Sequence, residues 1–373
     1  MLLMLLAAFT ARMWHLSTPA LWLDEAFEYW TAELPWAELP NAVRYALQPP
    51  LYTYLLHWWL QVDIAPTWLR FLSVTLSMIG GAALLAWANL ALDRVGIWTT
   101  GALISITPVV IQYAQDVAEY ALLFCTLSCA LLCLSRTHTH TGWRRWLALM
   151  IWGVLSVYSH YGALLILIPL AGFTFLENLV RQRYQAVYQQ ALVSLAGLLL
   201  IAPLVYGFLW EQFVHMPGRP ALSLLLFTAP AASLINLRDT LLTLWMNSGP
   251  QVPLPMATQW LGQLGLAIFM LACGYQLVMP GAWAAKRTIL WFWLAVAVYY
   301  LAVRSGAYAY GVFGGRYSSI LAPLFILTGG ALGAYLLGQK QNTLALGLTT
   351  MYLCLALAAW PLSRPFIQLC MDR

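Results

Sequence analysis

Charged residues are scarce in this chain of 373 residues: only 8% are Asp, Glu, Lys or Arg, whereas 62% are hydrophobic. About a quarter of the residues in a soluble domain are charged, so this composition excludes a water-soluble enzyme. The 18 basic and 13 acidic residues are too sparse for a nucleic-acid-binding surface. Apolar runs of about 20 residues, long enough to cross a bilayer, recur along the chain. A transmembrane barrel would show dyad alternation, which runs such as 192–209 lack.

Familiar cofactor and nucleophile motifs are missing as well. The sequence has no P-loop, no dinucleotide-binding glycine fingerprint, no Cys/His zinc spacing and no Gly-x-Ser-x-Gly elbow. Cys125, Cys129 and Cys133 recur every four residues in one apolar run, which favours small-residue helix packing over disulfides or a metal site. We predict no cofactor and no metal site; the residues leave open whether a divalent metal bridges Asp24 or Asp116 to a donor phosphate.

The hydrophobic pattern predicts an all-α polytopic membrane protein. About eleven helical spans are expected, with outer juxtamembrane helices such as 51–62 and 221–246 lying in the interface plane. We expect one transmembrane domain over 1–373, outer loops at 17–66 and 211–257, and no soluble C-terminal domain. The expected spans are 1–16, 67–92, 97–113, 118–135, 146–158, 161–177, 190–210, 258–279, 288–304, 317–338 and 343–361.

The distribution of charge predicts the orientation. With the N-terminus inside, nine basic residues, including both lysines, fall in short inner loops, and the other nine lie in or beside outer segments roughly three times longer. Eleven of the 13 acidic residues fall outside. We therefore expect the unusual chemistry on the outer face of a plasma membrane, most simply a bacterial inner membrane facing the periplasm.

The first outer loop carries an adjacent acidic pair, Asp24 and Glu25, among Trp and Leu residues. Desolvation at the water boundary makes a carboxylate a stronger base, so the pair is a candidate catalytic site. The alternative, equally weighted from the residues alone, is a helix start with Asp24 as N-cap and Glu25 and Glu28 in the first turn.

Other outer segments offer further polar candidates. Asp116 and Glu119 precede the span 118–135, and their spacing places them on one helix face; simple helix capping is the alternative. Arg316 follows two glycines, and its planar fork of donors suits a phosphate. Both Arg316 and Arg70 could alternatively be interfacial anchors. His160 joins two spans on the outer side, where a hydrogen-bonded interface residue is the simpler interpretation.

Six motifs in order resemble the GT-C fold glycosyltransferases, and specifically the bacterial members similar to dolichyl-phosphate-mannose protein mannosyltransferases and aminoarabinose transferases (glycosyltransferase families 39 and 83). They are Leu-Trp-x-Asp-Glu-Ala at 21–26, Gln-Pro-Pro-Leu-Tyr at 48–52 with Leu-Leu-His-Trp at 55–58, Trp-Leu-Arg-Phe-Leu-Ser at 68–73, Tyr-Ala-Gln-Asp at 113–116 with Tyr-Ala-Leu-Leu at 120–123, Ser-His-Tyr-Gly-Ala-Leu at 159–164, and Gly-Arg-Tyr at 315–317 with Pro323.

The resemblance implies a polyprenyl-phosphate sugar donor in the outer leaflet and a lipid, glycan or protein acceptor. It places the acceptor-activating base on Asp24, with Glu25 beside it, and a second acid on Asp116. Many relatives have an Arg where this chain has Ala118, which leaves Glu119 as an extra carboxylate. Further candidate contacts to donor phosphate or substrate are Arg316, Arg70, Tyr317, His160, Gln48, Tyr52, His57 and Glu119.

A phosphate leaves as a stable anion, so a single carboxylate base suffices for transfer, and Arg316 would stabilise the departing charge. We expect one displacement with inversion at the anomeric carbon. Two alternatives stay open: a lipid-linked-sugar flippase or other transporter, and a non-catalytic assembly subunit. Transporters favour inverted repeats and ionisable groups near the midplane, neither of which is evident here.

Overall fold

The computed structural model describes residues 1–17, 20–45, 48–139, 142–209, 241, 256–304 and 319–338. All regular elements within these residues are helical, which confirms the all-α prediction. Four of the described helical segments are long and apolar enough to cross a membrane: Pro66–Ala91, Tyr120–His138, Tyr161–Val180 and Tyr184–Phe208. The protein is therefore an integral membrane protein. The expected span 343–361 and nearly all of the loop 211–257 lie outside the described residues, so the count of eleven spans stays a prediction.

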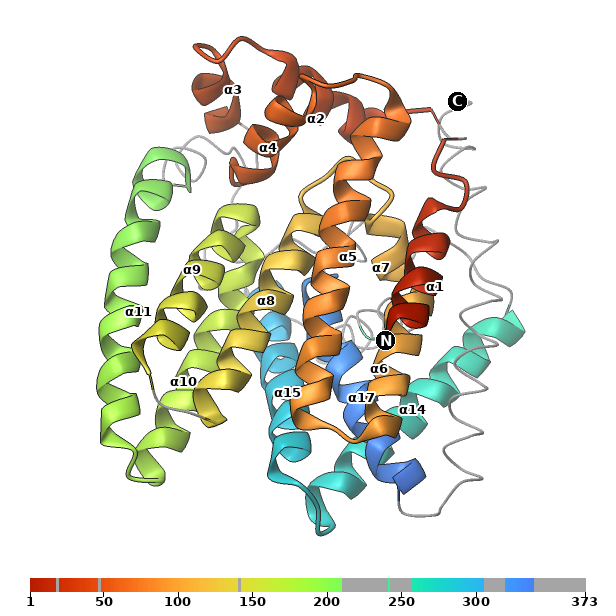
Figure 1. Ribbon diagram of the computed structural model, residues 1–373, viewed down its shortest axis with the longest axis vertical. Coiled ribbons are helices and arrows are strands. Elements are labelled where there is room, and N and C mark those ends of the chain that lie inside the picture. The colour runs from red at the N-terminus through yellow and green to blue at the C-terminus, as the bar shows by residue number, and fades with distance from the viewer. Residues whose placement is uncertain are drawn as a thin grey trace. The chain divides into compact units, whose positions relative to one another are not determined.

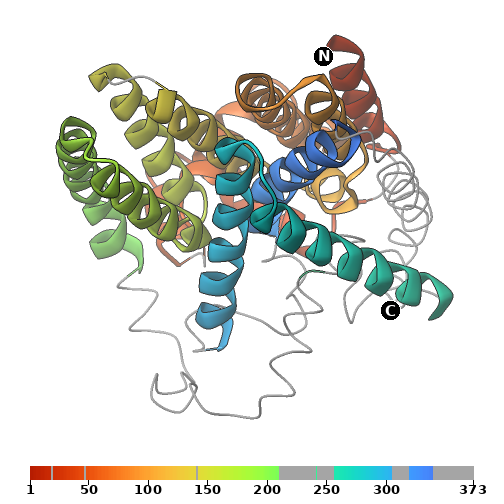
Figure 2. The ribbon, with the colours of Figure 1, turned by 90° about the horizontal axis from the view of Figure 1, so that it is seen from below.

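The chain divides into two compact units, and its helices are drawn in Figures 1 and 2. The first unit contains α1 (Leu2–Met13), α6 (Arg94–Ile106), most of α7 (Pro108–Tyr113), α14 (Met256–Val278), α15 (Trp283–Arg304), η4 (Ser319–Leu321) and α17 (Ala322–Gly338). The second contains α2 (Leu23–Glu33), α3 (Leu39–Tyr45), α4 (Leu51–Trp59), most of α5 (Pro66–Ala91), α8 (Tyr120–Thr139), α9 (Trp143–Ser159), η1 (Tyr161–Ala163), α10 (Leu164–Val180), α11 (Tyr184–Leu204) and η2 (Val205–Leu209).

Close helix packing in the first unit depends on small residues. Helix α17 lies against α6, and a Cβ added at Gly330 would collide with the Thr100 hydroxyl and press on the carbonyl of Gly96. A Cβ at Gly333 would meet Thr99 in the same way. Because lipid offers no hydrophobic driving force between helices, this kind of close approach is how membrane helices gain packing energy.

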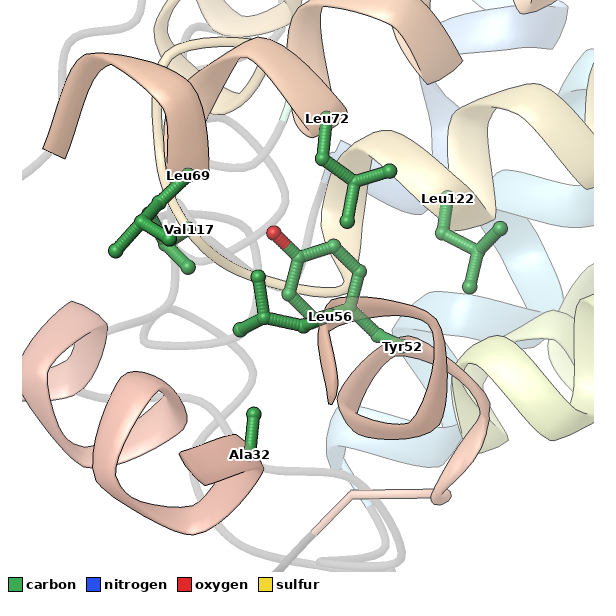
Figure 3. Packing of buried hydrophobic residues seen from close by; sticks show 7 residues of the cluster. All are labelled: Ala32, Tyr52, Leu56, Leu69, Leu72, Val117 and Leu122. Atoms are coloured by element: carbon green, nitrogen blue, oxygen red, sulfur yellow. The ribbon is translucent and has the colours of Figure 1, made fainter. Parts of the chain in front are cut away.

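The second unit carries short helices at one end of its long ones. In Figure 1, α2, α3 and α4 lie at the N-terminal end of α5, and α9 packs between α8 and α11. The buried cluster in Figure 3 joins these short helices to the bundle: Ala32, Tyr52, Leu56, Leu69, Leu72, Val117 and Leu122 come from α2, α4, α5, the segment before α8, and α8 itself. The short helices are therefore anchored to the bundle by their own apolar faces.

One expected span is divided in the structure. The run 97–113 forms α6 and α7, separated at Thr107, whose ψ of 113° is extended. The next residue is Pro108, and a residue before proline is pushed away from the helical region by the proline ring. The remaining described spans form helices within a few residues of the expected ends. The stripe Cys125, Cys129 and Cys133 is buried on α8 and its thiols are free.

Candidate functional site

A buried ion pair links the acidic motif to the first long helix of the second unit. Nε of Arg70 donates to Oε1 of Glu25 over 2.8 Å, and Nη2 of Arg70 donates to Oε2 over 2.6 Å. The two side chains are 3% and 1% exposed. The same guanidinium also donates to the carbonyls of Leu16 and Ala20, at 3.2 Å and 3.0 Å. These donors of Arg70 are directed at protein acceptors, so the geometry gives the pair a structural role.

The Glu25 carboxylate also holds two backbone segments. Its Oε2 accepts the N–H of Trp22 over 3.3 Å, and its Oε1 accepts the N–H of Val117 over 3.0 Å. The first bond closes the start of α2, and the second reaches the segment between α7 and α8, 92 residues away. Because Asp24 precedes Glu25 and Asp116 precedes Val117, this one carboxylate fixes the backbone beside both predicted acids.

Asp24 and Asp116 are both partly exposed, in contrast to the buried Glu25 between their segments. The N-cap of α2 is Trp22 and not Asp24, and Asp24 and Glu25 lie in the first turn. Carboxylates in a first turn are stabilised by the helix dipole, so the helix-start interpretation applies to this segment whether or not it is catalytic. The two acids combine a fixed backbone with partial access to solvent, which suits a group that must meet a substrate.

Among the carboxyl groups that the structure describes outside the spans, that of Glu28, one turn beyond Asp24 on α2, has the most strongly shifted pKa. It accepts a hydrogen bond from the hydroxyl of Thr53 on α4 over 3.1 Å. Burial and the negative charge of Glu119, with a smaller effect of Asp24, raise the pKa of Glu28 to about 8, although the Thr53 hydrogen bond opposes the shift. The sequence predicts Glu28 only as a residue of the first turn; its spacing of four from Asp24 is the signal that relates it to the acidic pair.

Glu119 and His160 meet where α8 begins and α9 ends. The N–H of Gly162 donates to Nδ1 of His160 over 2.9 Å, so the neutral ring carries its proton on Nε2. That nitrogen faces Oε1 of Glu119 at 4.0 Å. Burial lowers the pKa of His160 to about 3, which keeps the ring neutral at physiological pH. The ring also packs against Tyr120, with centroids 5.7 Å apart.

Tyr52 and His57 on α4, predicted as substrate contacts, bind protein groups on neighbouring helices. The Tyr52 hydroxyl shares a hydrogen bond of 2.9 Å with the Ser73 hydroxyl, and both residues are fully buried (Figure 3 shows Tyr52 within the apolar cluster). Nδ1 of His57 lies 2.7 Å from the carbonyl of Ala32. These bonds hold α4 against α5 and α2. Gln48 is partly exposed just before α4.

The remaining predicted contacts, Arg316 and Tyr317, lie outside the described residues. Within the described ranges, no group of three or more His, Cys, Asp or Glu side chains is arranged to hold a metal ion. The residues brought together in the second unit are thus Asp24, Glu28, the Asp116–Glu119 segment and His160, and the Glu25 and Arg70 pair joins the segments of Asp24 and Asp116.

Part of the chain is similar to a known protein family. Residues 47–206 match the dolichyl-phosphate-mannose-protein mannosyltransferase family. This match confirms the resemblance over that segment, which contains Arg70, Asp116, Glu119 and His160. It supports a glycosyltransferase that uses a lipid-linked sugar. No curated protein matches the chain.

Two solved structures are similar to the chain at low sequence identity. The apo structure of ArnT from Cupriavidus metallidurans is 13% identical, with a TM-score of 0.44, and the match covers 91% of this chain and 77% of that one. The oligosaccharyltransferase from Archaeoglobus fulgidus, tethered to an acceptor peptide, is 13% identical with a TM-score of 0.48. That match covers 99% of this chain, which spans 55% of the oligosaccharyltransferase.

Proposed function

We propose that this protein transfers a sugar from a polyprenyl-phosphate-linked donor to an acceptor hydroxyl on the outer face of the membrane, with inversion at the anomeric carbon. The observation that carries the proposal is the Glu25 carboxylate, which binds Arg70 and the N–H of Val117 and so holds Asp24 and Asp116 on two fixed, partly exposed segments. The family match over residues 47–206 supports the same chemistry.

In this proposal Asp24 is the general base. Its carboxylate accepts the proton of the acceptor hydroxyl as the oxygen attacks the anomeric carbon; the bond to the phosphate oxygen breaks, and the phosphate leaves with the electron pair. Because the phosphate is a stable anion, no strong general acid is needed. Asp116 orients the acceptor, and Glu25 and Arg70 act as positioning residues. Arg316 is assigned to the donor phosphate, where it stabilises the developing charge.

The test is turnover of radiolabelled polyprenyl-phosphate sugars by the full chain in lipid nanodiscs, with acceptor hydroxyls supplied. Asp24→Asn is compared with Asp63→Asn, because Asp63 is an exposed carboxylate in the same outer loop. Loss of a positioned base typically costs about 10²- to 10⁴-fold in rate. We expect that loss for Asp24→Asn with donor binding retained, and wild-type turnover for Asp63→Asn.

Equal turnover by both variants would remove Asp24 from the role of base. Movement of intact donor across the bilayer, without cleavage of the sugar–phosphate bond, would instead show a transporter. A wild type that consumes no donor with any acceptor would favour a non-catalytic assembly subunit.

A further inference from the structure

Helices α9 and α11 begin side by side at the end of the second unit that lies opposite α2, α3 and α4 (Figure 1). Trp146 of α9 packs against Ala186 of α11, and the rings of Trp143 and Tyr188 lie 6.4 Å apart. The first backbone N–H groups of both helices therefore point out of the same end of the unit, where their partial positive charges add.

No acidic side chain caps the beginning of either helix. The N-caps, Gly142 and Arg183, form no side-chain capping bond, and the first turns contain no Asp or Glu. Helix α6, by contrast, begins after Asp93, whose carboxylate accepts the N–H of Gly96 over 2.9 Å. Because a side-chain oxygen usually satisfies these N–H groups, the beginnings of α9 and α11 carry positive charge that no carboxylate of their own compensates.

Arginine side chains add full positive charges at the same end. Arg144 is exposed in the first turn of α9 and forms no ion pair within the described ranges. Nη1 of the neighbouring Arg145 is buried and has no hydrogen-bond partner in the described part of the chain. Arg183 donates to a neutral acceptor, the carbonyl of His138, over 3.3 Å. Three guanidinium groups thus accompany the two helix N-termini.

Glu177 on α10 is the one acidic residue that the structure describes at this end, and its contacts are to other cations. Its Oε1 accepts from Nε of Arg181 over 3.1 Å, and its Oε2 lies 3.8 Å from Nδ1 of His138. A buried guanidinium nitrogen without an acceptor is costly, because it has lost its hydrogen bonds to water without replacing them. An anion at this end would supply both the acceptor and the missing charge.

An exposed apolar stripe continues from the same end along both helices. On α9, Leu147 and Ile151 follow Trp143 at intervals of four residues, so the three side chains share one face. The segment that contains α11 is the least buried of the four long apolar segments. The exposed leucines on α11 beyond Tyr188 include Leu192, Leu195 and Leu199. Because Trp and Tyr favour the level of lipid headgroups, the pair Trp143 and Tyr188 marks the boundary between the positive end and the apolar stripe.

We infer that the beginnings of α9 and α11 form a binding site for an anionic phospholipid. Its phosphate lies at Arg144, Arg145 and Arg183, and its acyl chains lie along the exposed apolar side chains of the two helices. The positive end and the apolar stripe are contiguous, which suits a phosphodiester carried on hydrocarbon chains better than a free anion or an acidic peptide. The site is at the opposite end of the second unit from the candidate catalytic residues, and the inference does not depend on the proposed transfer.

The experiment measures which lipid lies beside the beginning of α11. Tyr184, exposed in the first turn of α11, is replaced by Cys and labelled with a bimane maleimide. The described cysteines are buried, and Cys354 and Cys370 are replaced by alanine. The full chain is placed in phosphatidylcholine nanodiscs with a trace of nitroxide-labelled lipid, either phosphatidylglycerol or phosphatidylcholine. The ratio of the two quenching constants gives the local preference for the anionic lipid.

Two variants are directed at the site, and a third is a matched control. Arg144→Gln combined with Arg145→Gln removes two charges. Gly142→Asp places a carboxylate at the N-cap of α9, where the φ of 166° is extended and an added Cβ would meet no atom within 4 Å. Because an acidic N-cap stabilises a helix, this variant decides the question even where the arginine variant fails to fold. The control, Arg94→Gln, removes an exposed arginine beside an N-cap that Asp93 already provides.

We expect the wild type and Arg94→Gln to prefer phosphatidylglycerol on the order of tenfold, since each arginine near an anionic headgroup contributes roughly fivefold. The double arginine variant should quench equally with both lipids, and Gly142→Asp should lose most of the preference. Equal quenching in the wild type, or a preference that survives in the double variant or in Gly142→Asp, overturns the inference. An equal loss in Arg94→Gln also overturns it, because a general attraction by net charge would then be the cause. Soluble glycerophosphoglycerol, which lacks acyl chains, should leave the preference unchanged; if it abolishes the preference, the site binds a free anion and the assignment to a lipid is wrong.

Discussion

Replacing Arg70 by leucine is the most informative test of how the acidic motif is held. The substitution removes two charged hydrogen bonds to Glu25, at 2.8 Å and 2.6 Å, and two bonds to the carbonyls of Leu16 and Ala20. It leaves the Glu25 carboxylate, 1% exposed, with only the backbone N–H groups of Trp22 and Val117. Breaking a buried pair from one side typically costs about 3–5 kcal/mol, because an uncompensated charge stays buried. At about 2–4 °C per kcal/mol, the expected fall in Tm is on the order of 10 °C.

The assay uses the buried cysteines of α8 as reporters of the second unit. Cys125, Cys129 and Cys133 are free and buried, so a thiol-reactive fluorogenic maleimide labels them only when the helices around them open. Replacing the other three cysteines, Cys273, Cys354 and Cys370, by alanine in all proteins confines the signal to this helix. Labelling during a thermal ramp then gives the apparent Tm of the second unit.

A double-mutant cycle separates the interaction energy of the Glu25–Arg70 pair from the contribution of each side chain alone. Glu25→Gln should cost about 1.5–3 kcal/mol, the worth of hydrogen bonds to a charged group. Combining Glu25→Leu with Arg70→Leu removes both charges, so the double variant should be clearly more stable than the sum of its single changes predicts. An Arg70→Leu protein with wild-type Tm, or single effects that simply add, would refute the reasoning that the pair fixes this segment.

Three further predictions concern stability. The pKa of Glu28 rises from 4.5 to about 8 on folding, so the folded state binds a proton that the unfolded state releases between these pH values. Wild-type stability should therefore fall as the pH rises from about 4.5 through about 8. Glu28→Gln should lack this fall, so the difference in Tm between the two proteins should grow over that window and then level off. Tyr52→Phe should lower the free energy of unfolding by about 1–3 kcal/mol, because it leaves the buried Ser73 hydroxyl without its hydrogen-bond partner. The Tm is measured by maleimide labelling of α8. An unchanged Tm would mean that this hydrogen bond makes no net contribution to stability. Gly330→Val should destabilise the first unit by about 1–3 kcal/mol, because the added side chain overpacks against Thr100. The Tm is measured by maleimide labelling of a protein in which the buried Cys273 is the single remaining cysteine. An unchanged Tm would contradict the close approach of α17 and α6.

Helix positions could be predicted from the sequence because each span is specified by its own apolar run. The exception, the break at Thr107, has a local cause as well: Pro108 follows it, although the apolar run around them predicts a single helix. The helical character of 51–62 followed from local pattern too, since Leu51–Trp59 buries Tyr52 and Leu56 on one face. Local signals thus accounted for most of the described secondary structure.

The site was harder to predict because its decisive contacts join residues far apart in the chain. Glu25 binds Arg70 at a separation of 45 residues and Val117 at a separation of 92. Nothing in the local sequence distinguishes Glu25 from Asp24 as the partner of a buried arginine. The alternative of Asp24 as N-cap was wrong, because the Glu25 side chain accepts the N–H of Trp22 and so makes Trp22 the N-cap, with α2 beginning at Leu23.

The helical geometry of α2 explains how one short motif divides its acids among different environments. Successive side chains on a helix are separated by about 100°, so if Glu25 points to Arg70, Asp24 is turned about 100° away and Glu28 lies between the two. On the opposite side lie Leu23, Phe27 and Trp30, which are exposed by 76%, 56% and 61%. The environments differ around the helix: Glu25 is buried and paired with Arg70, Glu28 is partly exposed and accepts a hydrogen bond from Thr53, and Asp24 is partly exposed. Rotating α2 would bury Asp24 or expose Glu25, so the same ion pair that stabilises the helix also determines that Asp24, and not Glu25, is accessible to solvent.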